Sequence, residues 1–208
     1  RVLVDKAKGS RIYLRNKRSI LDATGGFGVL NHGHNHSRSL KAREFCSKKL
    51  KMEVNNSFLS PALAALSHNI CSQLPEPLNN AFFPNSGSES VDVAIRLALK
   101  HFNGNRNLIL HSDIAFHGKS LGPQSISNSG ENPIKIQTLL NAKKFKFNSI
   151  ASIDKVIEDD IKNNSKCTIA AIIVEPFSAS TMTECTEEFL LHLRKVAKKY
   201  EILLIYDE

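Results

Sequence analysis

The segment TIAAIIV, residues 168 to 174, is a continuous apolar run made mostly of β-branched residues. It lacks the polar alternation that marks a strand with one face in water. A strand of this kind needs cover on both faces, and parallel sheets with helices on either side provide it. The segment therefore predicts a buried central strand of an α/β domain.

Segments on both sides of this run repeat an alternation of short apolar stretches and helical periods. The apolar stretches are AFFP (81–84), LILH (108–111) and ILLIY (202–206). The helical periods cover residues 89–102, 150–161 and 186–200. Apolar side chains recur every three or four positions within them. Strands that alternate with helices in this way predict a three-layer α/β/α sandwich with a mostly parallel sheet.

The first third of the sequence has a different pattern. RIYLR (11–15) and SILDA (19–23) flank a turn-like Asn-Lys-Arg and predict a β-hairpin. Two helices should follow, one over residues 39–51 and one that begins after Ser60 as N-cap with Pro61 in its first turn. We therefore expect an N-terminal hairpin and helices in front of the α/β domain.

Composition limits the functions that the chain can have. With 208 residues, 41% hydrophobic and 23% charged, it is an ordinary globular sequence. The net charge of +8 is not accompanied by a basic stripe with stacking aromatics, so we expect a solvated basic surface and no nucleic-acid partner. The four cysteines lack close pairs, which predicts reduced thiols and a cytoplasmic protein.

No apolar run reaches the length of a membrane span, so we expect no membrane association. The sequence begins at Arg1 and not at Met, so a targeting segment upstream of it would be invisible.

The loop before residues 89–102 has the composition of a phosphate site. Ser86, Gly87 and Ser88 open a helix directly after a predicted strand. A helix N-terminus offers free N–H donors and positive potential, and small residues let an anion approach. These residues alone fit a phosphate site and a plain Ser-capped helix equally well.

Three other strand ends carry chemistry at the same edge of the predicted sheet. Phe116 and His117 follow LILH, Glu175 follows the central strand, and Asp207 follows the last strand. Ligands of open α/β sheets bind beyond the carboxyl ends of the strands. Phosphate donors, a flat ring for stacking and a carboxylate for a pyridinium nitrogen together describe a pyridoxal-phosphate pocket.

At this point the sequence resembles a known family, the class III (ω-amino) aminotransferases of the fold type I pyridoxal-phosphate enzymes. The matching segments are SILDATGGFGVLNHGHNH (19–36), FFPNSGSESVDVAIRLA (82–98), AFHGKSLG (115–122), AAIIVEP (170–176) and LLIYDE (203–208). FFPNSGSESV and AFHGKSLG look most like the putrescine and ornithine branch. The resemblance implies residues 1–58 in the small domain and an active-site loop, and residues 59–208 in a partial cofactor-binding large domain.

The resemblance also implies a role for each matching residue. Gly87 and Ser88, with Ser86 beside them, would bind the phosphate of pyridoxal 5′-phosphate. Phe116 would stack on its ring, with His117 and Gly118 shaping that wall. The catalytic carboxylates would be Asp207, on the ring nitrogen, and Glu175, close to the ring.

Such an enzyme transfers an amino group from an ω-amine or amino acid, here of ornithine or diamine type, to a 2-oxo acid. Members of the family work as homodimers, so a homodimer is implied.

The sequence departs from the family in two places. After Glu175 and Pro176 the family continues with a second glutamate that acts as a gate, and this sequence has Phe-Ser-Ala-Ser instead. The lysine that forms the Schiff base lies downstream of the last strand in the family, whereas this sequence stops at Glu208. We therefore expect an N-terminal fragment that is inactive by itself.

Two alternatives remain open at this stage. Residues 113–120 end in Gly-Lys-Ser after an apolar strand, as in a P-loop nucleotide-binding domain, although Asp113 stands where the first glycine belongs. The second alternative is a non-catalytic, aminotransferase-like remnant. A metal site is not expected, because no further ligand completes the set of His32, His34 and His36.

Overall fold

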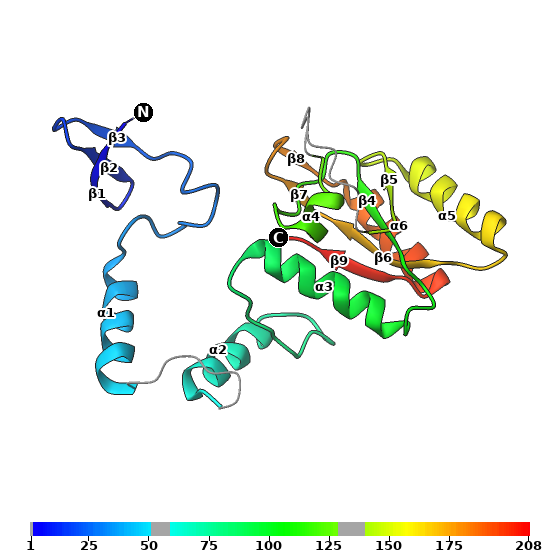
Figure 1. Cartoon of the computed structure of the whole chain (residues 1–208), viewed down its shortest axis with the longest axis horizontal. Helices are drawn as coiled ribbons and strands as arrows, with labels where there is room; N and C mark the ends of the chain where they lie inside the picture. Colours follow the sequence, from blue (N-terminus) through cyan, green and yellow to red (C-terminus); the bar gives the residue numbers. More distant parts are fainter. Residues whose placement is uncertain (1, 51–58, 129–139) are drawn as a thin grey trace. The chain divides into compact units, whose positions relative to one another are not determined.

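The computed structural model describes residues 2–50, 59–128 and 140–208, which form two units, Arg1–Asn80 and Ala81–Glu208 (Figure 1). The C-terminal unit is built on a four-stranded sheet. Its strands are β4 (Leu108–Ser112), β5 (Ala142–Phe145), β6 (Ile169–Val174) and β9 (Leu203–Tyr206). They are all parallel and lie in the order β5-β4-β6-β9. The predicted parallel sheet is therefore confirmed.

Helices cover both faces of this sheet, as the apolar strands require. These helices are α3 (Gly87–His101), α5 (Ile150–Asn164) and α6 (Glu187–Tyr200). On β6, Ile172 and Val174 belong to the core that α5 and α6 cover, whereas Ala171 and Ile173 belong to the core under α3. This alternation is the two-residue period of a strand, and it confirms the three-layer α/β/α sandwich.

The N-terminal unit contains a small antiparallel sheet of β1 (Val4–Lys8), β2 (Arg11–Leu14) and β3 (Ser19–Leu21). The predicted hairpin is therefore present as β2 and β3, with β1 added at its side. The helices are α1 (Ser37–Phe45), which continues as the π-helix η1 (Cys46–Leu50), and α2 (Pro61–Cys71). Ser60 caps α2 as expected, since its Oγ accepts from the Leu63 N–H at 3.4 Å.

Several elements differ from the sequence-based expectation. AFFP (81–84) forms no strand: it pairs with no described strand, and Phe82 is exposed. The structure adds β5, the short helix α4 (Leu121–Ser125), and the hairpin of β7 (Phe177–Ser178) and β8 (Thr183–Glu184). The β5 sequence AKKF carries two exposed lysines because β5 is an edge strand, and such residues give no apolar signal.

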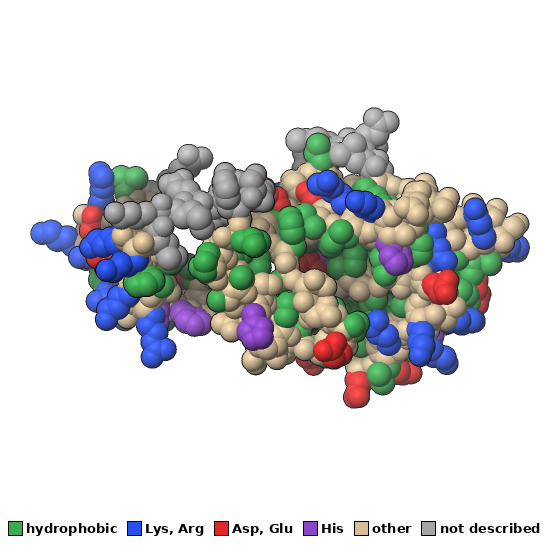
Figure 2. All heavy atoms as spheres, turned by 90° about the horizontal axis from the view of Figure 1, so that it is seen from below, with side chains coloured by type: hydrophobic (Ala, Val, Ile, Leu, Met, Phe, Trp, Pro, Cys, Tyr) green, Lys and Arg blue, Asp and Glu red, His purple; other side chains and the backbone are tan. Residues whose placement is uncertain are grey.

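The excess positive charge is confined to the N-terminal unit. Residues 1–80 hold 13 Lys and Arg against 5 Asp and Glu, and residues 81–208 hold 15 of each. Figure 2 accordingly shows blue side chains clustered over part of the N-terminal unit, while blue and red are interspersed over the face of the C-terminal unit seen there.

None of the described helices combines the length and the apolar composition that a membrane crossing requires.

Candidate active site

The carboxyl ends of the parallel strands meet at one edge of the sheet, and a cavity of about 280 Å³ lies there. The residues that line it come from the start of α3, the segment after β4 and the end of β9. They are Gly87, Ser88, Phe116, His117, Gly118, Lys119 and Asp207. Six of these seven positions belong to the predicted site.

The start of α3 supplies free backbone donors to this cavity. Ser86 is the N-cap, and its Oγ accepts from the Glu89 N–H at 3.2 Å, while Glu89 Oε2 accepts from the Asn85 N–H at 2.7 Å. The N–H groups of Gly87 and Ser88 lie in the first turn, where a helix offers them no internal acceptor. A side chain at Gly87 would meet no atom within 4 Å, so an anion can approach.

Ser86 therefore caps the helix and does not line the cavity. Its hydroxyl is used in the way that the plain capped-helix interpretation predicts. Gly87 and Ser88 are the two residues of this loop that line the cavity.

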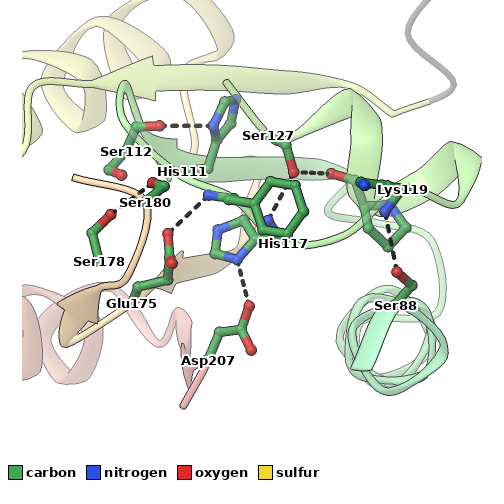
Figure 3. Close-up of polar contacts among 12 residues, drawn as sticks. Ser88, His111, Ser112, His117, Lys119, Ser127, Glu175, Ser178, Ser180 and Asp207 are labelled. Atoms are coloured by element: carbon green, nitrogen blue, oxygen red, sulfur yellow. Dashed lines mark hydrogen bonds and ion pairs between the residues drawn. The ribbon is translucent and has the colours of Figure 1, made fainter. Parts of the chain in front are cut away.

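The segment after β4 carries the aromatic wall. Phe116 has 46% of its surface exposed, whereas the His117 side chain is completely buried. The Phe116 N–H donates to Glu175 Oε2 at 2.8 Å, and the His117 N–H donates to Ser127 Oγ at 2.8 Å (Figure 3). The backbone of this segment is therefore fixed at two successive residues, and the Phe116 ring stands free.

His117 and Asp207 form a pair across the cavity floor. His117 Nδ1 lies 2.8 Å from Asp207 Oδ2, and His117 Nε2 is buried without a partner among the described residues (Figure 3). A proton on Nε2 would leave a buried N–H unsatisfied, so the proton is assigned to Nδ1. His117 thus donates to Asp207, and the second carboxylate oxygen of Asp207 is left for a ligand.

Glu175 lies behind Phe116 and does not line the cavity. Burial raises the pKa of this carboxyl group; the Phe116 N–H and His117 oppose the rise, and Asp207 adds to it. Its clear contact is with the Phe116 backbone, so it supports the wall.

The segment 116–119 packs closely on α3. Gly118 has a φ of +128°, and a side chain there would overlap Ser88, since it would come within 3.0 Å of the Ser88 Cα. The Lys119 N–H donates to Ser88 Oγ at 3.1 Å. Sequence reasoning missed the cavity-facing position of Lys119, although this residue lies in the AFHGKSLG segment. It also missed the contact of Ser127, which belongs to no recognisable pattern.

A family model described as aminotransferase class-III matches residues 1–208 of this chain. The chain belongs to the class III aminotransferases. This match confirms the resemblance found in the sequence. It also agrees with the parallel sheet.

Similar proteins include other members of this class III family. The acetylornithine aminotransferase of Clostridium acetobutylicum is 30% identical, over 100% of this chain and 52% of that protein. The omega-aminotransferase of Caulobacter vibrioides is 26% identical, over 99% of this chain and 52% of that protein. The class III chain thus spans about half the length of the curated relatives it matches.

Solved structures show the same fold. A transaminase from the marine bacterium Virgibacillus aligns with a TM-score of 0.89 at 22% identity, over 99% of this chain and 49% of that chain. An adenosylmethionine-8-amino-7-oxononanoate aminotransferase from Methanocaldococcus jannaschii aligns with a TM-score of 0.88 at 17% identity, over 100% of this chain and 49% of that chain.

The nucleotide-binding alternative is not supported for this class III aminotransferase chain. Asp113, at the position of the first P-loop glycine, accepts from the Phe147 N–H at 2.9 Å. The Ser120 hydroxyl, at the position of the magnesium ligand, donates to Asp92 at 2.7 Å. Both side chains are therefore engaged within the protein.

In the part of the chain that the structure describes, the histidine string belongs to no metal ligand set. His34 pairs with Asp22 at 2.8 Å, and the described residues hold no group of three or more side chains suited to a metal ion.

Proposed function

We propose that this chain is the cofactor-binding part of a pyridoxal-phosphate-dependent aminotransferase. The complete enzyme transfers an amino group from an ω-amine or amino acid of ornithine or diamine type to a 2-oxo acid. One observation carries the proposal: free N–H donors of α3, the exposed Phe116 ring and the His117–Asp207 pair surround a single cavity. A ligand with a phosphate at one end and a basic ring at the other matches this arrangement.

The residues present fit pyridoxal phosphate. Gly87 and Ser88 would hold its phosphate, Phe116 would stack on its ring, and Asp207 would accept from its ring nitrogen. Lys119 adds a positive charge to the cavity wall. When bound, the cofactor supplies an electron sink that stabilises negative charge developing on the substrate carbon.

The chain's own residues prepare the site for this chemistry. The Nδ1–H of His117 holds Asp207 in one orientation, in which the other carboxylate oxygen would be available to the ring nitrogen. The Glu175 carboxylate fixes the Phe116 backbone, so that the ring excludes water from one face of the ligand. His117 and Glu175 are thus assigned supporting roles, and Asp207 the direct one.

The domain assignment and the assembly belong to the same proposal. Residues 1–58 would contribute to a small domain and an active-site loop, and residues 59–208 to the large domain. A homodimer is supported by the family resemblance. A cytoplasmic location is supported by the free cysteines, Cys46, Cys71, Cys167 and Cys185.

The test uses the full-length protein and its Asp207→Asn variant. We expect the wild type to bind pyridoxal phosphate with a visible absorbance band and to transfer amino groups from ornithine, acetylornithine or putrescine to a 2-oxo acid. Asp207→Asn should lower the rate at least about 100-fold, since a neutral amide no longer favours a charged ring nitrogen. Asp159→Asn, an exposed change on α5, is the control.

A wild-type protein that binds the cofactor but transfers no amino group from any donor would indicate the non-catalytic remnant instead. A protein that does not bind the cofactor would contradict the proposed function.

A further inference from the structure

Two hydrogen bonds one helical turn apart join α3 to the segment after β4. Ser88 Oγ accepts from the Lys119 N–H at 3.1 Å, and Asp92 Oδ2 accepts from the Ser120 hydroxyl at 2.7 Å. Ser88 and Asp92 are four residues apart and lie on the same face of the helix. The second contact, between Asp92 and Ser120, is called the Asp92 latch below.

Glycines stand opposite both of these α3 residues. A side chain at Gly118 would overlap Ser88, and one at Gly122 would overlap Asp92 Oδ1. Gly122 has no positive φ, so its glycine is required by the close approach of Asp92 and not by the backbone conformation. The surfaces of α3 and the segment are therefore matched from Ser88 to Asp92, over about one helical turn.

The contact matters because the two ends of the cavity belong to these two elements. The N–H groups of Gly87 and Ser88 come from α3, while Phe116 and His117 come from the segment after β4. Asp92 does not line the cavity. Whatever it does for a ligand, it does through Ser120.

We propose that Asp92 is a positioning residue that fixes the distance between the phosphate-binding turn of α3 and the ring-binding segment. The inference rests on the proposed function, because it assumes a ligand that engages both ends at once. Joining two binding groups in one molecule increases affinity only when the protein holds their two sites at the matching distance. Loss of the Asp92 latch should therefore weaken the binding of a ligand that carries both the phosphate and the ring. It should leave the binding of a separate phosphate or a separate ring almost unchanged.

The experiment measures the dissociation constants of three ligands from the full-length protein without its cofactor. The joined ligand is 4-deoxypyridoxine 5′-phosphate, which lacks the aldehyde and so binds without a covalent bond. Its halves are 4-deoxypyridoxine and inorganic phosphate. We expect Asp92→Ala to raise the dissociation constant of the joined ligand about 10-fold and those of the halves less than about 2-fold. Asp92→Asn, which keeps an oxygen that can accept from Ser120, should restore most of the loss.

Ser125→Ala is the matched control. Its hydroxyl donates to the Gly122 carbonyl at 2.6 Å, in the same short helix, without reaching α3. We expect it to leave all three dissociation constants unchanged.

Two results would overturn the positioning role. Equal weakening of all three ligands by Asp92→Ala would indicate a general loss of structure, and no weakening of the joined ligand would show that the latch is irrelevant to the site. Failure of the wild type to bind 4-deoxypyridoxine 5′-phosphate would instead contradict the proposed function, and the inference with it.

Discussion

His111 on β4 is a buried histidine close to the active site, and only 2% of its surface is exposed. Its Nδ1 lies 3.0 Å from the carbonyl oxygen of Ser112, so this nitrogen carries the proton of the neutral ring. Burial lowers the pKa of His111 to about 4; His117 and Lys144 act in the same direction, while Ser112 and Asp113 oppose it. The folded protein therefore keeps His111 neutral well below pH 6.

This histidine should make the folded state sensitive to mild acid. The pKa of His111 falls from 6.5 in the unfolded chain to about 4 in the folded one, so between these values the unfolded state binds the extra proton. Stability is complete above about pH 7 and is lost as the pH falls toward 4, by at most about 3 kcal/mol. Urea unfolding of the full-length protein at pH 7 and pH 5 should show a smaller loss for His111→Gln.

Equal pH dependence in both proteins would mean that His111 is not the group responsible.

Gly118 is a second residue whose local geometry affects the whole site. Replacing it with alanine adds strain at a φ of +128° and an overlap with Ser88. We expect Gly118→Ala to lower the stability by about 1–3 kcal/mol and to weaken pyridoxal-phosphate binding, because the segment must move away from α3. Thermal unfolding and cofactor titration of the full-length protein would measure both effects.

Gly104→Ala separates the two causes. Gly104 also has a positive φ, +77°, but a side chain there would meet no atom within 4 Å. Gly104→Ala should lower the free energy of unfolding without changing the affinity for the cofactor. A similar loss of affinity in both variants would argue against the overlap with Ser88.

At the scale of elements, a buried carboxylate joins α5 to β6. Asp160 is only 1% exposed, and it accepts from the Thr168 N–H at 2.7 Å and the Thr168 hydroxyl at 2.6 Å. The Asn164 amide donates to it at 3.0 Å. Asp160 thus fixes the end of the helix to the start of the central strand.

Removal of this carboxylate should strongly destabilise the C-terminal unit. Asp160→Ala leaves the partly buried Thr168 donors without their acceptor, and we expect a loss of about 3 kcal/mol in the free energy of unfolding. Asp159→Ala changes an exposed neighbour and should stay within about 0.5 kcal/mol of the wild type. Chemical denaturation measures the difference, and equal effects would contradict the role of Asp160.

The elements with a regular apolar period were predictable from the sequence, and the others were not. The helix predicted over residues 150–161 is found as α5, and the central strand as β6, because burial on a fixed face leaves a periodic pattern. AFFP has the composition of a strand, but a strand also needs a hydrogen-bonded neighbour, which composition does not reveal. The edge strand β5 could not be predicted, because its two exposed lysines interrupt the apolar pattern.

In the candidate site, too, some residues could be predicted from the sequence and others could not. Glu175 and Asp207 could be placed because parallel strands end at one edge of the sheet. The contacts Ser127–His117 and Asp92–Ser120 join hydroxyl groups to residues 10 and 28 positions away. No local pattern marks such pairs, so the support of the site could be found only in three dimensions.

For the whole molecule, the net positive charge suggests a general attraction for phosphate, but the charge is not located where the cavity lies. The net charge of +8 belongs to residues 1–80, while the unit that holds the cavity has no net charge. Affinity for a phosphate must therefore come from local groups, the α3 N-terminus and Lys119, and not from a general positive field.

The open side of the sheet should make the 208-residue chain self-associate when it is expressed alone. β9 is an edge strand in the described sheet, and a groove of about 600 Å³ lies beside it, lined by residues that include Leu97, Leu203 and Ile205. Unpaired strand edges next to apolar surface favour pairing between copies. Sedimentation velocity should show a mass that rises with concentration.

Leu97→Lys should reduce this association, because it places a charge in the groove. Leu191→Lys is the matched control, since Leu191 is an exposed residue of α6 that does not line the groove. A monomeric wild-type chain at all concentrations would contradict the prediction.

The common direction of the four strands has a practical consequence for labelling. Phe116, His117 and Asp207 follow the carboxyl ends of β4 and β9, so the turns that lead into the strands lie at the opposite edge of the sheet. The exposed turn at Ser165 and Lys166, ahead of β6, is one of these. A fluorescent dye, an epitope or a surface tether attached at this turn would therefore leave the candidate site undisturbed.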